Sequence, residues 1–167
     1  MNRKLILKIS LPVLTFLAAW LGGLSTYYTD WSWYESLNKS SLNPPNYLFG
    51  IVWPILYTLM AVVSFLHAKL IYKWYIPQLV LNSAWSWLFF AHQQPEIAFI
   101  DILALIGLNL VILMKLKEQG AWLSFALYLP YLLWICFAAF LNISIAILNQ
   151  SAFITLLILV IMSGFPS

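Results

Sequence analysis

Aromatic and amide side chains recur at helical spacing in three segments of this sequence, and they are its best candidates for binding a ligand. Residues three or four, seven and eleven places apart lie on one face of an α-helix. Each of the three faces carries a large aromatic ring and a group that can form hydrogen bonds. The faces are Trp53-Tyr57-Met60-Ser64, Gln78-Asn82-Trp85-Phe89 and Tyr131-Trp134-Ala138-Asn142. Rings with a few amides suit a flat, apolar molecule, because small-molecule sites are mostly apolar with few polar groups.

These faces allow two interpretations. In the first, the rings fill the interior of a helix bundle and the amides join helices, without any ligand. In the second, the rings meet at a similar depth and leave a chamber that a flat molecule fills. Each residue taken singly is compatible with packing alone, but three indoles (Trp53, Trp85 and Trp134) together with two phenols favour a chamber. Offset stacking of aromatic rings adds about 0.5–1.5 kcal/mol per pair beyond the burial of area.

The composition places these faces in a membrane. Eight Lys or Arg and five Asp or Glu are the only charged residues among 167, and 63 % of the residues are hydrophobic, with a mean hydropathy of +0.90. A soluble domain has about 25 % charged residues, whereas this chain has 8 % and cannot cover a surface that faces water. A soluble enzyme, a nucleic-acid-binding protein and a disordered chain are therefore excluded.

Five apolar segments can each cross a bilayer, which requires about 20 residues. The segments cover 9–29, 46–68, 76–92, 97–114 and a stretch that begins near Ala121. Short polar turns, such as 69–73, separate most of them, and a longer polar loop covers 30–45, where prolines and asparagines are typical of a turn before a helix.

We predict an all-α, integral membrane bundle of five transmembrane helices over residues 1–149, followed by an apolar C-terminal tail over 150–167. In an alternative with six helices, the last apolar segment is broken near Asn142.

The basic residues sort to one side of the five predicted helices. Seven of the eight share that side, and only Lys39 falls on the other. The seven are Arg3, Lys4, Lys8, Lys69, Lys73, Lys115 and Lys117. Because basic residues accumulate on the cytoplasmic side, we expect a bacterial inner-membrane protein with a cytoplasmic N-terminus. A mitochondrial outer membrane stays open as the alternative.

Small side chains form a stripe along the first predicted helix. The stripe contains Thr15, Ala18, Ala19, Gly22, Gly23 and Thr26. Small residues let a second helix approach closely. The stripe therefore predicts either a contact within the bundle or the seam of a homodimer.

The sequence offers little for other chemistry. It has no Ser/His/Asp arrangement, glycine-rich phosphate loop or pair of carboxylates, so hydrolysis and phosphoryl transfer lack catalytic groups. His67 and His92 fall on opposite sides of the membrane and Cys136 is the only cysteine, so we expect no metal site. Asp101 is the one acid well inside an apolar segment. It could contact a proton or a ligand, or it could be stabilised by the dipole of a helix start.

Four ordered motifs over about residues 10–148 resemble the translocator protein (TspO/MBR) family, whose bacterial members are called tryptophan-rich sensory proteins. The motifs are Trp33-Tyr34-x-x-Leu37-x-Lys39-x-x-x-x-Pro44-Pro45, Gly50-x-Val52-Trp53-x-x-x-Tyr57, Gln78-Leu79-x-Leu81-Asn82-x-x-Trp85-x-x-x-Phe89-Phe90 and Pro130-Tyr131-Leu132-x-Trp134-x-x-x-Ala138-x-x-Leu141-Asn142. The resemblance implies a five-helix membrane bundle, usually dimeric. It also implies a chamber for porphyrins, haem-like tetrapyrroles, sterols and benzodiazepine-type ligands, with the first loop as a lid and no required cofactor.

The resemblance also implies ligand-binding residues. Trp33 and Tyr34 belong to the lid, and the chamber is expected to be lined by Trp53, Tyr57, Asn82, Trp85, Trp134 and Ala138. The function implied is a receptor or carrier; the alternatives are a porphyrin-degrading enzyme driven by light and oxygen, and a tetrapyrrole exporter. One departure bears on degradation, because the family commonly has an indole before the two prolines and this chain reads Lys39-Ser40-Ser41-Leu42.

Overall fold

The computed structural model describes residues 3–149, and this part of the chain is helical with no strand. The predicted tail over 150–167 lies outside the described residues. The elements in chain order are α1 (Arg3–Leu24), η1 (Ser25–Tyr28), α2 (Trp31–Ser36), α3 (Asn46–Ser86), η2 (Trp87–Ala91), α4 (Pro95–Glu118) and α5 (Trp122–Leu148). Four of these helical stretches are long and apolar enough to cross a membrane.

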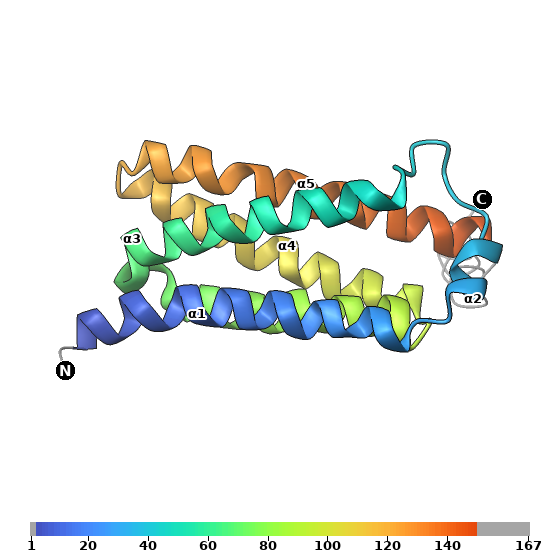
Figure 1. Ribbon diagram of the computed structural model, residues 1–167. Helices are drawn as coiled ribbons and strands as arrows, with labels where there is room; N and C mark the ends of the chain where they lie inside the picture. The colour runs from blue at the N-terminus through green and yellow to red at the C-terminus, as the bar shows by residue number, and fades with distance from the viewer. Residues whose placement is uncertain (1–2, 150–167) are drawn as a thin grey trace, which may run out of the picture.

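Helix α3 is a hairpin that accounts for two of the predicted crossings. A straight helix of its 41 residues would be about 60 Å long, twice the apolar thickness of a bilayer. The backbone leaves helical geometry at His67 (φ −117°, ψ 26°), and the Tyr57 hydroxyl reaches the Asn82 amide 25 residues later. Figure 1 shows α3 turning at one end of the bundle and returning beside α1. The five-helix prediction is therefore confirmed.

Three details of the sequence prediction are wrong. The turn expected at 69–73 is helical, because the chain reverses at His67 instead. The stretch 30–45 is not a loop throughout, since Trp31–Ser36 forms α2. The break near Asn142 in the six-helix alternative is absent, because α5 continues to Leu148.

The helix ends follow the residues that define them. Pro95 begins α4 with Glu96 in its first turn, and Lys115 and Lys117 lie in its last turn. This charge order opposes the helix dipole at both ends and is stabilising. Gly120 follows with φ +70°, a left-handed conformation that glycine adopts without steric cost and that ends the helix. The short turn this produces sets α5 antiparallel to α4.

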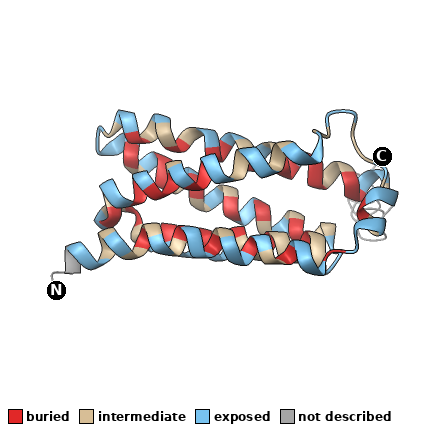
Figure 2. Cartoon of the chain, in the orientation of Figure 1, coloured by how far each residue is buried: buried red, intermediate tan, exposed pale blue. Residues whose placement is uncertain are grey.

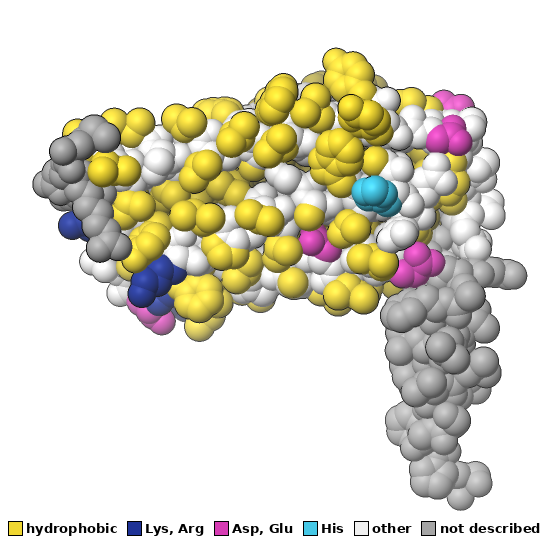
Figure 3. Space-filling view, turned by 90° about the horizontal axis from the view of Figure 1, so that it is seen from below, with side chains coloured by type: hydrophobic (Ala, Val, Ile, Leu, Met, Phe, Trp, Pro, Cys, Tyr) yellow, Lys and Arg dark blue, Asp and Glu magenta, His cyan; other side chains and the backbone are white. Residues whose placement is uncertain are grey.

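The bundle buries polar side chains among an apolar core and exposes large apolar side chains on its outside. Figure 2 shows buried residues along the inward faces of the helices, and these include fully buried Tyr75, Tyr128 and Tyr131. Large apolar side chains such as Trp20 and Val80 are more than half exposed. Figure 3 shows apolar side chains along the flank, Lys and Arg at one end and most Asp and Glu toward the other. This distribution fits a lipid environment, where polar side chains face the bundle interior.

The small-residue stripe of α1 is used within the chain. The Thr15 and Tyr75 hydroxyls lie 2.7 Å apart, and the Ser83 hydroxyl donates to the Ala18 carbonyl at 2.9 Å. A Cβ added at Gly22 would meet Ser86 Oγ at 3.5 Å. The first interpretation of the stripe, a contact inside the bundle, is therefore right, because α1 packs its small side chains against the second half of α3.

Candidate ligand-binding site

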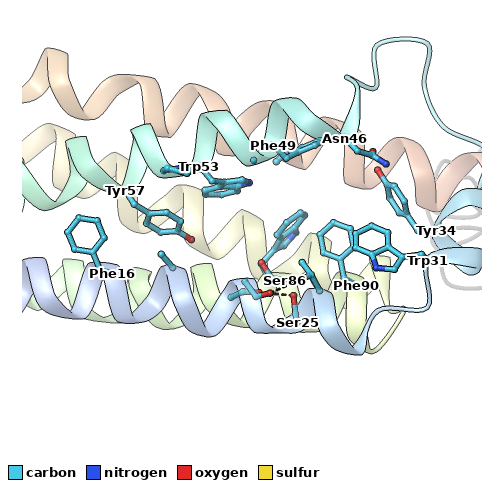
Figure 4. Close-up of a pocket in the computed structure, with 18 of the residues that line it drawn as sticks. Phe16, Ser25, Trp31, Tyr34, Asn46, Phe49, Trp53, Tyr57, Ser86 and Phe90 are labelled. Carbon is cyan, nitrogen blue, oxygen red and sulfur yellow. Dashed lines mark hydrogen bonds between the residues drawn. The ribbon is translucent and has the colours of Figure 1, made fainter.

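A cavity of about 570 Å³ lies between α1 and the first half of α3, below the lid helix α2 (Figure 4). Aromatic rings make up much of its wall: Phe16, Trp31, Tyr34, Phe49, Trp53, Tyr57, Trp85 and Phe90. Figure 4 shows Trp53 and Tyr57 reaching from α3 toward α1, with Trp31 and Tyr34 at the lid end. The volume is within the range of about 300–1,000 Å³ that small-molecule sites occupy.

The cavity exists because large side chains on α3 face small ones on α1. Ala19, Gly22 and Gly23 line its α1 side, and a Cβ at Gly23 would meet no atom within 4 Å. Several lining residues are also exposed at the outer surface of the bundle, among them Gly50 and Thr58. The cavity therefore opens sideways between α1 and α3, toward the region that lipid occupies.

The lid helix α2 is held by a cap and by its aromatic rings. The Asp30 carboxylate accepts from the Ser32 hydroxyl at 2.6 Å and from the Ser32 and Trp33 amides at 3.0 and 3.4 Å. The bonds from the Ser32 hydroxyl and the Trp33 amide hold the pKa of Asp30 below its ordinary value. Tyr34 is buried against Phe90, with 5.6 Å between ring centroids. Its burial raises the pKa of the Tyr34 hydroxyl, so it stays neutral at physiological pH.

A pair of amide hydrogen bonds ties the lid to the end of α5. The Asn38 amide donates to Asn149 Oδ1 and Asn149 Nδ2 donates to the Asn38 carbonyl, both at 3.0 Å. Nearby, the Lys39 ammonium lies 4.6 Å from the Tyr34 ring centroid and donates to the Leu37 carbonyl at 3.2 Å. Besides its aromatic contacts, the lid is thus held by hydrogen bonds to the side chain of Asn149, the residue that caps the end of α5.

A chain of buried polar groups begins at the cavity wall and leads away from it. The Tyr57 hydroxyl donates to Asn82 Oδ1, and Asn82 Nδ2 donates to the Tyr131 hydroxyl at 2.9 Å. Tyr131 in turn donates to Gln78 Oε1 at 3.1 Å. Only Tyr57 of these four lines the cavity. Asn82 therefore positions the Tyr57 ring by accepting a hydrogen bond from its hydroxyl, and the amide itself is enclosed behind the ring.

The three indoles expected in the chamber have different environments. Trp53 lines the cavity and stacks on Tyr57, with 5.5 Å between ring centroids. Trp85 also lines it, and its Nε1 donates to Asn142 Oδ1 at 3.0 Å. Trp134 is not part of the lining; it packs behind Phe49 at 5.8 Å, and its buried Nε1 has no hydrogen-bond partner within the described residues.

The structure brings five of the eight expected residues to the cavity: Tyr34, Trp53, Tyr57, Trp85 and Ala138. Trp33, Asn82 and Trp134 lie outside its lining. Trp33 packs against the buried Phe89 ring at 6.2 Å between ring centroids. Whether any of the eight contacts a ligand stays a prediction.

Phe90, which the helical spacing did not single out, reaches the cavity through a widened turn. Residues Trp87–Ala91 form a π-helix, in which the His92 amide donates to the Trp87 carbonyl at 2.9 Å. A π-turn inserts a residue and shifts the helical register, so Phe89 is buried in the core while Phe90 faces the cavity. The predicted face of this segment ended at Phe89, so the spacing did not place Phe90 at the cavity. Trp31 and Phe49 were also missed, although Trp31 sits one turn before Tyr34.

The remaining candidate groups lie apart from the cavity. Asp101 is half-buried on α4, beyond its first turn, and does not line the cavity. One of its carboxylate oxygens is buried with no partner among the residues described here. Within residues 3–149, no group of three or more His, Cys, Asp or Glu side chains could hold a metal ion.

Comparisons with known proteins identify the family of this chain. The family model described as the TspO/MBR family matches residues 11–148. The chain belongs to the TspO/MBR family. The resemblance in the four motifs is thereby confirmed, and the chain is an integral membrane protein.

Members of the TspO/MBR family from distant organisms match most of this chain. The tryptophan-rich protein TspO of Archaeoglobus fulgidus is 37 % identical over 153 residues, covering 86 % of this chain and 98 % of that protein. The translocator protein of Ovis aries is 34 % identical, covering 72 % and 79 %. The tryptophan-rich sensory protein of Cereibacter sphaeroides is 29 % identical, covering 70 % and 77 %.

Proposed function

We propose that this protein is a membrane receptor or carrier for porphyrins, haem-like tetrapyrroles and related flat, apolar molecules such as sterols and benzodiazepine-type compounds. The observation that carries the proposal is the cavity of about 570 Å³ walled by aromatic rings under a tied lid. Indoles and phenols provide flat apolar faces for stacking. The Tyr57 hydroxyl donates its hydrogen bond to Asn82, so its oxygen can accept a hydrogen bond from a ligand. No cofactor is required by this function.

The sideways opening between α1 and α3 supports a ligand that partitions into lipid. A flat apolar molecule dissolved in the bilayer can reach the cavity without crossing water. The protein is proposed to sit in a bacterial inner membrane with its N-terminus in the cytoplasm, since seven of eight basic residues lie toward the end that carries the α3 bend. A homodimer remains part of the proposal, but its seam cannot use the α1 side chains that already pack on α3.

Titration with protoporphyrin tests the proposal directly. Protoporphyrin is expected to quench tryptophan fluorescence of the purified protein to saturation, and Trp53→Ala is expected to weaken binding at least about fivefold, since it removes a stacking face and apolar area. Trp20→Ala is the matched control, because this indole is 60 % exposed on α1 and does not line the cavity. Equal loss in both variants, or none in either, would contradict binding in this cavity.

The alternative of light-driven porphyrin breakdown draws on the same cavity. Trp31, Trp53 and Trp85 all line it, so three indoles would lie within reach of a bound macrocycle. Illumination of a stoichiometric complex in the presence of oxygen separates the two functions. A receptor or carrier leaves the porphyrin absorption band unchanged beyond the bleaching of free porphyrin, whereas an enzyme removes it at a rate that falls in Trp53→Phe.

A further inference from the structure

A second cavity lies at the end of the bundle opposite the lid, where α3 bends. Its volume is about 260 Å³, and it is lined by Lys8 of α1, residues 66–70 at the bend, and Gln119 between α4 and α5. It shares no lining residue with the aromatic cavity. Three parts of the chain that are distant in sequence thus meet around one small pocket.

The lining of this pocket is positively charged. Lys8 and Lys69 contribute two ammonium groups, and the lining contains no carboxylate. Glu118 is the carboxylate nearest in sequence, next to Gln119, but it does not line the pocket. The Gln119 side chain adds an amide that can donate hydrogen bonds. Lys8, Lys69 and Gln119 thus supply N–H donors from three different parts of the chain.

Contacts with neighbouring helices hold the walls in place. The Lys8 ammonium lies 5.1 Å from the Phe65 ring centroid, so Lys8 of α1 contacts α3 just before its bend. His67 Nε2 lies 2.9 Å from Ser124 Oγ of α5, so the bend of α3 is joined to the start of that helix. The bend of α3, which supplies most of the pocket wall, is therefore held against the neighbouring helices.

The position of the pocket at the basic end of the bundle favours an anionic ligand. It lies at the end of the bundle where Lys and Arg gather (Figure 3), just beyond the apolar flank, which is the depth of lipid phosphate groups in a bilayer. Leu66 and Leu70 line it beside the lysines and offer an apolar wall for the first carbons of an acyl chain. Basic pockets between transmembrane helices at this depth bind anionic headgroups, and lysine is a common ligand of phosphate.

We propose that this pocket binds the phosphate of an anionic phospholipid from the adjoining leaflet. The pocket admits one headgroup and not a whole lipid, so the acyl chains remain in the bilayer against the outer face of the bundle. The binding is independent of the aromatic cavity, and failure of one site leaves the other untouched.

Native mass spectrometry of the purified full chain tests this proposal. The protein is titrated with phosphatidylglycerol, with phosphatidylcholine of the same acyl chains, and with inorganic phosphate. We expect one molecule of phosphatidylglycerol to be retained more tightly than phosphatidylcholine. Lys8→Gln combined with Lys69→Gln is expected to lower that affinity about 25-fold, at about fivefold for each lysine near a membrane surface.

The control is Lys73→Gln combined with Lys115→Gln, which removes the same charge from the same end but touches no lining residue of the pocket. It should change the affinity less than about twofold. Equal losses in both double variants would show attraction by the whole basic end and overturn the site. Equal retention of both lipids would also overturn it, as would binding of inorganic phosphate without selective retention of phosphatidylglycerol. Far-ultraviolet circular dichroism of each variant shows whether the helices of the bundle are folded.

Discussion

Replacing Asn149 by alanine is expected to loosen the lid over the aromatic cavity, and within the bundle it removes only the bond from Asn149 Nδ2 to the Ile145 carbonyl at the end of α5. The side chain forms two reciprocal hydrogen bonds with the backbone of Asn38, both at 3.0 Å, and it is the only group of α5 for which such bonds to the lid are observed within residues 3–149. Each hydrogen bond of this kind contributes about 0.5–1.5 kcal/mol net. Because both are near water, we take the lower half of that range, about 1–2 kcal/mol for the pair.

A loss of about 1–2 kcal/mol raises the population of the open lid about 5- to 30-fold, since about 1.4 kcal/mol corresponds to a factor of ten. Limited trypsin digestion measures this population. Lys39 is the only Lys or Arg in the lid segment 30–45, and in the closed lid its ammonium is held by the Glu35 and Leu37 carbonyls and the Tyr34 ring. Cleavage after Lys39 therefore requires opening, and its rate follows the open population when closing is faster than cleavage.

Ser144→Ala is the matched control for this experiment. The Ser144 hydroxyl donates to the Phe140 carbonyl within α5 at 2.7 Å and has no bond to the lid. We expect Asn149→Ala to speed cleavage at Lys39 about 5- to 30-fold and Ser144→Ala to leave it unchanged, with equal thermal stability of the two bundles. The same cleavage rate in both variants would refute the reasoning that the Asn149 bonds hold the lid.

Two further outcomes follow from the geometry of the cavity and of the lid. Gly23→Leu should place a side chain in the open space on the α1 side of the cavity and lower protoporphyrin affinity at least about tenfold without loss of thermal stability. The control is Gly107→Leu on α4, because a Cβ there also meets no atom within 4 Å and Gly107 does not line the cavity. This control should leave protoporphyrin affinity unchanged. The Asp30 cap should stabilise α2 fully above the ordinary pKa of about 4 and lose that effect as pH falls through the lowered pKa of Asp30. Amide hydrogen exchange at Ser32 and Trp33, corrected for its intrinsic pH dependence, should therefore show protection at pH 5 that falls as the carboxyl group becomes protonated below its ordinary pKa. Protection that stays constant after Asp30 is fully protonated would count against the cap.

The helical periodicity predicted the inward faces well because a straight α-helix fixes which residues share a side. Trp53, Tyr57 and Trp85 lie at the cavity as that rule requires. The rule failed where the helix is not a regular α-helix. The bend at His67 lies within a stretch that reads as continuous helix, and the π-turn at Trp87–Ala91 shifts the register so that Phe90 faces the cavity.

Helical spacing also did not predict which inward-facing side chains line the cavity and which lie behind that lining. Asn82 and Tyr57 belong to two different predicted helix faces. Only the packed bundle shows that the Asn82 amide lies behind the Tyr57 ring and accepts a hydrogen bond from its hydroxyl. Trp134 was expected beside Trp53, yet Phe49 stands at the cavity with Trp134 packed behind it. Rings on different helices compete for the same position, and side-chain size and helix rotation together decide which one lines the space.

By itself, the sequence determined that this chain lives in a bilayer, how many times it crosses, and which face of each helix turns inward. These three properties follow from the charge content, the segment lengths and the 3.6-residue repeat of the helix, and each of these can be read from a segment without knowing its neighbours. The tertiary structure alone decided that the small side chains of α1 pack on α3 while Gly22 and Gly23 leave room for a cavity, and that Asn149 fastens the lid 111 residues away in the chain. Those features depend on how close two helices come, a distance set by all the side chains between them and by no single segment.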